Sequence, residues 1–566
     1  MATRSGVNKR RISQVMTSLS DIPSMSFMED LFGQEFPEAF GSGGTKSAKS
    51  ILDLPAELLA IIRDQLSGLE IKRLRLANKR LAERVHLRLD RVYVSPNRAN
   101  LQCLRKIMDH ARYRLNVVEV VWDDAQLDEY PDLQSFRHAV VADEHQQQRE
   151  LESLLKSLAQ ADQHDCQEYG AFEHDDLFLF DEAGKLTELA KEMLLRHDEQ
   201  LAKDMIARNA TTMSMEESYE LYQELYEEEQ EAMERGYDAA ALRHVLANCP
   251  TLKRVVLTSE VWRPWHPQPV YQTPFYRSLP LGFRKPSVWP WLSHRPHSTP
   301  EQASHRDNTM TRKLPNDKTS LPSEFRGYSI AVSSLLATPH SSVTEFIIYA
   351  AHEPIGITHQ LFATPNADFI LSMALAHTVP LKRLQLALNS HGSDATYLVR
   401  STQLHDFLAA LSYLEHLDLA PNCYFGHDAD TTLSLFRPKL MIPHALLPRL
   451  KTFALRNAAV ASDQLLPLIT AQTAAVHITL DNVHPVHPEM SYEHLFWRVG
   501  MHHESRVDVS RPMYEVSMCE GEGRCRVVCE ELCEWVYRGD WDMESVFVNG
   551  KIREGVGWVH GDRDLV

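Results

Sequence analysis

The stretches LKRLQL (residues 381–386), LEHLDL (414–419) and LKTFAL (450–455) repeat one spacing, with apolar residues at positions one, four and six. Successive side chains of a strand point to opposite faces, so positions four and six lie on one face and the residues between them on the other. Each stretch therefore predicts a strand with one buried face. The other face carries polar residues such as Arg383 and Asp418.

The same strand pattern recurs along the chain, paired with amphipathic helices. Further matches are Leu115/Val118/Val120, Leu252/Val255/Leu257, Val343/Phe346/Ile348 and, weakly, Ala475/Ile478/Leu480. Apolar periodicity predicts helices over residues 238–247, 328–337, 368–377, 404–411 and 462–470, each before an apolar strand. The strand template is of leucine-rich-repeat type, but intervals of 25 to 38 residues are long and irregular for such repeats. We therefore expect an α/β fold built as an irregular leucine-rich-repeat-like solenoid.

A separate helical pattern stands ahead of the strands, beginning LDLPAELLAIIRDQL at residue 52. Pro55 suits the first turn of a helix, where its missing N–H costs nothing, and Gly68 ends that helix. Leu69 to Leu76 predicts a second short helix, and Asn78 can cap a third. Three helices in about 40 residues are too few to bury a full core, so such a unit needs a neighbour or partner.

This segment resembles an F-box. The matching residues are Leu54-Pro55, Glu57-Leu58-Leu59 and Lys79-Arg80. Two departures from the usual pattern are an acidic residue displaced to Glu70, and Ala77-Asn78 in place of a valine or cysteine before the Lys-Arg pair. Later blocks, among them LANCPTLKRVVLTSEVW from residue 246, also look like F-box domain-containing proteins of filamentous fungi.

The resemblance implies a substrate-recognition adaptor of an SCF-type cullin–RING ubiquitin ligase. Its F-box would bind the Skp-type adaptor, and its repeats would bind a protein substrate. The expected adaptor-binding residues are Leu52, Leu54, Pro55, Leu58, Leu59, Ile61, Ile62, Leu66 and Leu74. The outward positions of three template strands give the expected substrate-binding residues Arg383, Gln385, His416, Asp418, Thr452 and Arg456. Such a protein is not an enzyme and has no catalytic residues.

The predicted organisation has four parts: a disordered tail (1–48), the F-box (50–95), the repeat region (96–490) and a C-terminal capping region (491–566). Two insertions interrupt the repeats, an acidic helical one (123–235) and a Pro/Trp-rich loop (262–325). The acidic insertion holds 31 acidic and 9 basic residues, whereas the whole chain has a net charge of −18. We expect it to be an appendage of the solenoid that repels nucleic acid.

The run Glu227-Glu228-Glu229 within this insertion has two interpretations. A run of like charges is usually a solvated helix face, and this interpretation is preferred. The alternative is an acidic docking arm for a basic partner.

The absence of membrane-spanning and secretory patterns bears on the cellular compartment of the protein. The chain has no apolar run long enough to span a membrane and no secretory signal at its start. We therefore expect a cytoplasmic or nuclear protein, not bound to a membrane, whose cysteines are reduced.

A C-terminal cluster, Cys519, Cys525, Cys529 and Cys533, lacks the Cys-x-x-Cys hairpin typical of zinc sites. We expect the last three to line one helical face and pack inward, with no metal and no cofactor. Two rival functions stay open: an F-box scaffold acting outside a ligase, and a metal-dependent enzyme. The enzyme would use these cysteines with His484, His487, His502 and His503.

Overall fold

The chain divides into two compact units, Met1–His86 and Leu87–Val566. The computed structural model describes residues 51–66, 68–145, 186–197, 212–258, 271, 273–286, 325–339, 341–349, 357–362, 366–389, 402–421, 441–486, 491–504, 511–519, 524–538, 545–548, 551–553 and 556–561. The predicted tail, 1–48, lies outside these residues. Among the helices described, none is both long enough and apolar enough to cross a membrane.

The described part of the first unit consists of short helices. These are η2 (Ile51–Asp53), α3 (Ala56–Gln65), α4 (Gly68–Ala77) and α5 (Lys79–Arg84). The three predicted helices are confirmed, and so is the cap, because the Asn78 side chain accepts a hydrogen bond from the Arg80 N–H at 2.8 Å. The Arg84 guanidinium donates to the carbonyls of Leu52 and Leu54, which ties the start of the unit to its last helix.

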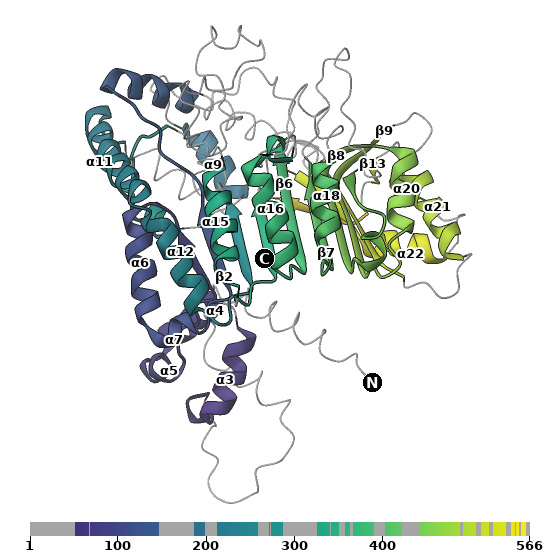
Figure 1. Ribbon diagram of the computed structural model, residues 1–566, viewed down its shortest axis with the longest axis horizontal. Coiled ribbons are helices and arrows are strands. Elements are labelled where there is room, and N and C mark those ends of the chain that lie inside the picture. Colours follow the sequence, from purple (N-terminus) through teal and green to yellow (C-terminus); the bar gives the residue numbers. More distant parts are fainter. Residues whose placement is uncertain are drawn as a thin grey trace, which may run out of the picture. The chain divides into compact units, whose positions relative to one another are not determined.

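The second unit is built on a mostly parallel sheet (Figure 1). Its strands are β1 (Arg91–Val94), β2 (Glu119–Asp123), β3 (Arg254–Thr258), β4 (Glu345–Tyr349), β5 (Ile357–Thr358), β6 (Arg383–Asn389), β7 (His416–Ala420), β8 (Thr452–Ala461), β9 (His477–Val486), β10 (Met513–Cys519), β11 (Arg524–Val528) and β14 (Trp558–Gly561). The order is β1-β2-β3-β4-β6-β7-β8-β9-β10-β11-β14, with β5 beside β6. Pairing is parallel up to β10 and antiparallel from β10 through β11 to β14. β12 (Phe547–Val548) and β13 (Lys551–Ile552) form a separate two-stranded hairpin, whose Phe547 and Ile552 join the main core.

Helices link the parallel strands and cover one face of the sheet. They are α6 (Arg98–Asp109), α7 (Ala111–Arg114), α12 (Tyr237–Asn248), α15 (Arg326–Leu336), α16 (Ala367–Thr378), α18 (Gln403–Ala410), α20 (Ser462–Thr470), α21 (Tyr492–Glu504) and α22 (Glu530–Arg538), with short η5 (His359–Phe362) and η7 (Leu447–Arg449). Each of α6, α12, α15, α16 and α18 packs against the next, in a row visible in Figure 1. Parallel strands need such crossovers, and the mixed α/β class is confirmed.

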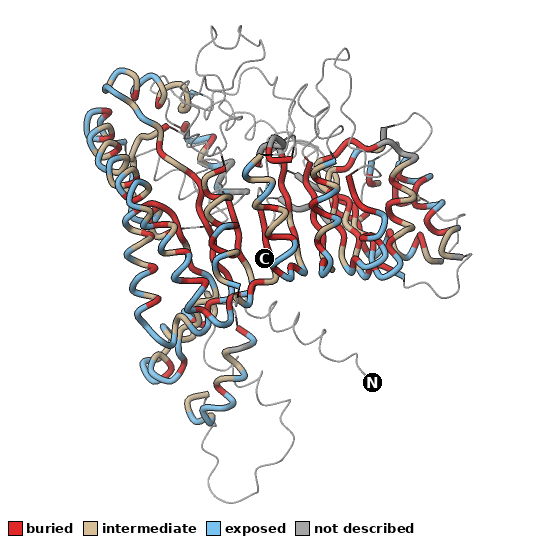
Figure 2. Tube along the Cα trace, in the orientation of Figure 1, coloured by how far each residue is buried: buried red, intermediate tan, exposed pale blue. Residues whose placement is uncertain are grey.

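The main core lies between these helices and the sheet. Template residues such as Leu384, Leu417 and Phe453 are at most 1% exposed and join one cluster with helix residues such as Leu375 and Leu408. Figure 2 shows the strands as the most continuously buried part of the unit. Six of the seven template matches place all three apolar residues in this core.

The first template match, Leu115/Val118/Val120, is wrong in register. Leu115 is 50% exposed and Val118 37% exposed, whereas Val117, Val120 and Trp122 are fully buried. The template therefore fits this strand two residues later, at Val117, Val120 and Trp122. A shift of two residues keeps the same strand face, so the apolar alternation alone does not distinguish the two alignments.

The acidic insertion packs against the opposite face of the sheet, so its description as an appendage is wrong for its described part. The contact is made by α11 (Met215–Glu234) and by residues 125–140; the described part of the insertion also holds α9 (Glu188–His197). A second cluster joins Val121, Val256 and Ile347 of the strands to Phe136 and Tyr222 of the insertion. The cluster also holds Tyr271 and Phe275, from the predicted Pro/Trp-rich loop and its short helix α13 (Pro274–Ser278). Strands β2 to β4 are therefore covered on both faces.

Glu229 of α11 is buried, which corrects its predicted place on a solvated helix face. It is 1% exposed and accepts hydrogen bonds from the Leu127 N–H at 2.7 Å and the Asn97 side chain at 3.0 Å. Its neighbour Glu228 stays at the surface and pairs with Arg98 at 2.9 Å. Successive helical side chains point about 100° apart, so one residue of a charged run can face inward. Burial raises the pKa of Glu229 to about 7, against the two hydrogen bonds that lower it.

The stability of the second unit should therefore depend on pH through Glu229. The pKa of Glu229 is about 7 in the folded chain and 4.5 in the unfolded chain. The protonated carboxyl therefore contributes its full stabilisation below pH 4.5, and this stabilisation is lost as the pH rises to 7. Between those values the free energy of unfolding of the wild type should fall relative to Glu229→Gln by on the order of 3 kcal/mol. Urea titrations at several pH values measure it. Glu227→Gln, an exposed change on the same helix, is the control, and parallel profiles for wild type and Glu229→Gln would contradict the assignment.

Candidate functional site

The first candidate surface is the exposed side of α3. Leu58 is 38% exposed and Ile61 59% exposed, and Pro55 before them is also exposed. These three residues, here called the α3 apolar surface, lie at successive intervals of three, so Leu58 is a neighbour of both Pro55 and Ile61. Because these apolar side chains are exposed and adjacent along α3, this side of the helix is a candidate interaction surface.

The remaining predicted adaptor-binding residues are placed differently. Leu59 is 3% exposed and Leu66 5% exposed, so both pack inside the protein. Leu52, Leu54, Ile62 and Leu74 are half-buried. The predicted set thus contains residues that stabilise the helices and residues that face solvent, as expected of an amphipathic helix.

The second candidate surface is the strand face turned away from the helices. Strand pairing sets the first residues of the strands side by side in one row, here called the first-residue row. Its members, in register, are Arg91, Glu119, Arg254, Glu345, Arg383, His416, Thr452 and His477. Opposite charges directly across a strand pair are stabilising, and the first five members alternate in sign.

The positive and negative members of this row form a continuous chain of ion pairs. Arg91 pairs with Glu119, and Arg254 pairs with Glu119 at 2.9 Å and with Glu345 at 2.7 Å. The chain ends at Glu345. The residues described in the structure give Arg383, the next member, no ion pair.

Four of the predicted substrate-binding residues meet near Arg383. Arg383, His416 and Thr452 are consecutive in the first-residue row, and Gln385 lies opposite Asp418. The His416 Nδ1 and Thr452 Oγ1 atoms are hydrogen-bonded at 2.8 Å. Burial and the nearby Arg383 charge lower the pKa of His416.

The other two predicted residues, Asp418 and Arg456, bind each other. Arg456 pairs with Asp418 at 3.0 Å and with Asp481 at 2.6 Å. Although burial lowers it, the pKa of Arg456 is raised by these two carboxylates. The three side chains, the Arg456 clamp, belong to β7, β8 and β9 and hold those strands together.

Four further charged residues of the strand face were not predicted from the sequence: Glu119, Arg254, Glu345 and Asp481. The signal for Arg254 and Glu345 was present, because each immediately precedes the second apolar residue of a template match, as Arg383 does. Their ion pairs could not be predicted from the sequence, because they depend on which strands are neighbours in the sheet.

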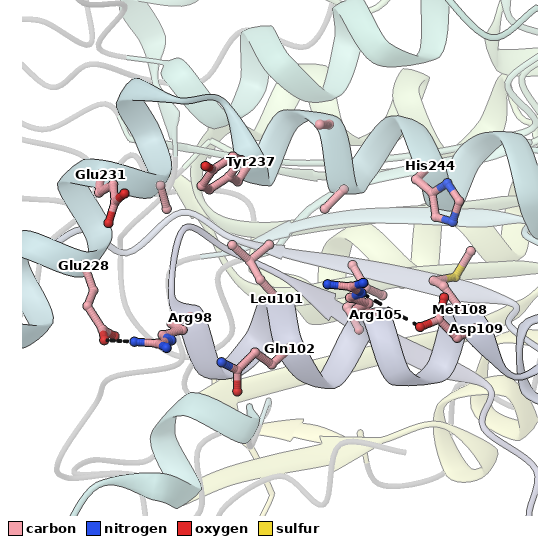
Figure 3. Close-up of a pocket in the computed structure, with 14 residues that line it drawn as sticks. Arg98, Leu101, Gln102, Arg105, Met108, Asp109, Glu228, Glu231, Tyr237 and His244 are labelled. Atoms are coloured by element: carbon pink, nitrogen blue, oxygen red, sulfur yellow. Dashed lines mark hydrogen bonds and ion pairs between the residues drawn. The ribbon is translucent and has the colours of Figure 1, made fainter.

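A cavity of about 710 Å³ lies on the helix side of the second unit, between α6, α12 and the end of α11 (Figure 3). Leu101 and Met108 of α6 point into it, and the Arg98–Glu228 pair stands at one end. Arg105 and Asp109 pair loosely at 3.9 Å on the same helix. The cavity combines an apolar floor with a mixed-charge rim, and no predicted site residue lines it.

The C-terminal cysteines do not share one helical face, which corrects that prediction. Cys525 lies on β11 opposite Cys519 of β10, whereas Cys533 lies in α22 and Cys529 just before it. His502 and His503 are on α21, His484 is on β9, and His487 is outside the described residues. Within the described part of the chain, no group of three or more His, Cys, Asp or Glu side chains suits a metal ion.

The Arg456 clamp gives a stability prediction. Arg456→Met leaves Asp418 and Asp481 without their shared cation, and the Asp481 side chain is 5% exposed. Because Arg456 is itself 30% exposed, we expect a loss of about 2–3 kcal/mol in the free energy of unfolding, below the range for a fully buried pair. Lys451→Met is the control, since its pair with Glu415 is more exposed and is worth less than about 1 kcal/mol. Equal losses for the two variants in urea denaturation would refute the clamp.

Similarity to known proteins provides no independent identification of the chain. Comparison of the sequence with models of protein families found no match, and a search of curated proteins found none either. The resemblance of residues 50–95 to an F-box therefore stays a prediction, based on the quoted residues.

Proposed function

We propose that the chain is a substrate-recognition adaptor of a cullin–RING ubiquitin ligase. The first unit acts as an F-box that binds the Skp-type adaptor. The second unit acts as an irregular leucine-rich-repeat-like solenoid that holds a protein substrate near the ligase. The protein works in the cytosol or the nucleus and catalyses no reaction itself. Raising the local concentration of a substrate is sufficient for this role.

The α3 apolar surface is the observation that supports the proposal most directly. Pro55, Leu58 and Ile61 belong to the segment that resembles an F-box, and they are exposed where the resemblance requires a binding surface. Burying an exposed Leu or Ile side chain in a complex contributes about 1.5–3 kcal/mol.

The strand face supports the second half of the proposal. The order of β1 to β10 follows the sequence, and the row of helices covers one face, as in a solenoid whose other face binds partners. The insertion covers that other face over β2 to β4. Strands β6 and β7, which carry Arg383, Gln385 and His416, lie beyond that cluster. The proposed substrate surface is therefore narrower than the repeat region.

Adaptor binding should be lost when the α3 apolar surface is charged. Leu58→Glu and Ile61→Glu each place a carboxylate in a contact that would exclude water, which costs several kcal/mol of binding, on the order of a hundredfold or more in Kd. Because both residues are exposed in the free protein, folding should be retained. Titration of purified Skp-type adaptor against each purified variant measures the affinity.

The matched control is Leu115→Glu, the same chemical change at a leucine of the second unit that is 50% exposed. It should bind the adaptor as the wild type does. Wild-type affinity for Leu58→Glu and Ile61→Glu would overturn the F-box assignment. Adaptor binding without recruitment of a cullin would favour the scaffold function instead.

Substrate capture should depend on Arg383 and Gln385 and not on the helix side. Arg383→Ala combined with Gln385→Ala removes a cation and an amide from the strand face without touching the Arg456 clamp. In affinity purification with mass spectrometry, we expect proteins other than ligase subunits to decrease at least about tenfold, a loss of about 1.4 kcal/mol, while adaptor recovery is unchanged.

The control removes the same two residue types from the helix side, as Arg243→Ala with Gln102→Ala, both exposed. It should leave the set of captured proteins unchanged. If the Arg383/Gln385 variant also leaves that set unchanged, recognition does not use this surface.

A further inference from the structure

Two cysteines lie close together where β11 ends and α22 begins. Cys529 immediately precedes α22, and its carbonyl accepts a hydrogen bond from the Cys533 N–H at 2.9 Å. The two residues are therefore one helical turn apart. Cys529 is 5% exposed, and Cys533 is half-buried.

The Cys533 sulfur is hydrogen-bonded to the backbone of Tyr514. The Tyr514 N–H donates a hydrogen bond to Cys533 Sγ at 3.2 Å, and the Cys533 thiol donates a longer one, at 3.6 Å, to the Tyr514 carbonyl. The shorter contact, made by the N–H, favours the thiolate. The sulfur also lies in the first turn of a helix, where the dipole stabilises negative charge. A hydrogen bond from the Cys529 thiol, together with the Tyr514 N–H and the nearby His477, lowers the pKa of Cys533 below its usual value. In contrast, burial raises the pKa of Cys249 to about 11.

We propose that Cys529 and Cys533 form a peroxide-sensitive dithiol, which hydroperoxides oxidise to an intramolecular disulfide. Residues one helical turn apart have Cβ atoms about 5–6 Å apart, and a disulfide needs about 3.5–4.5 Å. Cys529 lies outside the helix, so a change in its backbone dihedral angles can close this gap without unwinding α22.

The reaction consumes one hydroperoxide. The Cys533 thiolate attacks one peroxide oxygen and the O–O bond breaks, giving a sulfenic acid on Cys533 and releasing hydroxide, or alkoxide from an organic hydroperoxide. The Cys529 sulfur then attacks the Cys533 sulfur, the S–O bond breaks, and the S–S bond forms. The hydroxyl of the sulfenic acid and the thiol proton leave as water. Two thiols are thus oxidised by two electrons as the peroxide is reduced.

Mass spectrometry of the full-length chain tests this proposal directly. Trypsin cleaves after Arg526 and Arg538, so one peptide, 527–538, contains both cysteines and no other. The purified, reduced chain is treated with hydrogen peroxide and its remaining thiols are alkylated. We expect this peptide to be recovered unalkylated and two hydrogens lighter than its reduced form, at peroxide concentrations that leave Cys103 fully alkylated. Full alkylation of both cysteines, or a disulfide to Cys519 or Cys525, overturns the proposal.

Single substitutions separate the two roles. Cys529→Ser should stop the reaction at the Cys533 sulfenic acid, which dimedone traps, and Cys533→Ser should leave Cys529 reduced. Cys103→Ser is the matched control and should oxidise as the wild type does. Sulfenic acid on Cys529 in the Cys533→Ser chain would contradict the assigned roles. Circular dichroism checks that each variant is folded, and the wild-type mass result stands without any variant.

Discussion

Lateral pairing of in-register parallel strands is the interaction on which the second unit depends. It places the template's apolar residues in adjacent rows, so that Leu384, Leu417 and Phe453 pack side by side beneath the helices. The same register aligns the residues between them on the other face. A slip of one residue in any strand would exchange the two faces, burying charges and exposing leucines. One constraint therefore fixes both the core and the candidate substrate surface.

The charged rows follow from this register and divide the strand face into regions with different uses. From β1 to β4, carboxylates and guanidinium groups neutralise one another, and aromatic residues cover the middle of the strands. Between β7 and β9 the Arg456 clamp does the same. Charged side chains that are paired with one another in this way are less available to contact a partner. The residues between the two networks, around Arg383, are therefore the better candidates for the proposed substrate contact than the most highly charged positions.

Much of the fold could be predicted from local patterns, because those patterns report local physics. Pro55, Gly68 and the capping Asn78 each lie at the start of a helix of the first unit, and six template matches gave the core positions of their strands. The errors lie where distant segments meet. Nothing in the run Glu227-Glu228-Glu229 shows that its last residue finds a partner at Leu127, far away in the sequence. For the candidate site, the template gave the contiguity of Arg383, His416 and Thr452, but the pairing of Arg456 with Asp481 needed the neighbouring strand.

The arrangement of strands in sequence order also explains why the chain can carry so large an insertion. Strands β2 and β3 pair although the segment from Asp123 to Arg254 separates them, and β6 and β7 pair across the shorter segment from Asn389 to His416. The entropy lost on closing a flexible loop grows with the logarithm of its length. A connection roughly five times longer thus adds about 1–2 kcal/mol to the closure of that strand pair. The aromatic contacts of Phe136 and Tyr222 can offset so small a penalty, since each aromatic pair contributes about 0.5–1.5 kcal/mol beyond its buried area. A chain built from consecutive neighbours can therefore gain long segments at its loops while its strand register stays unchanged.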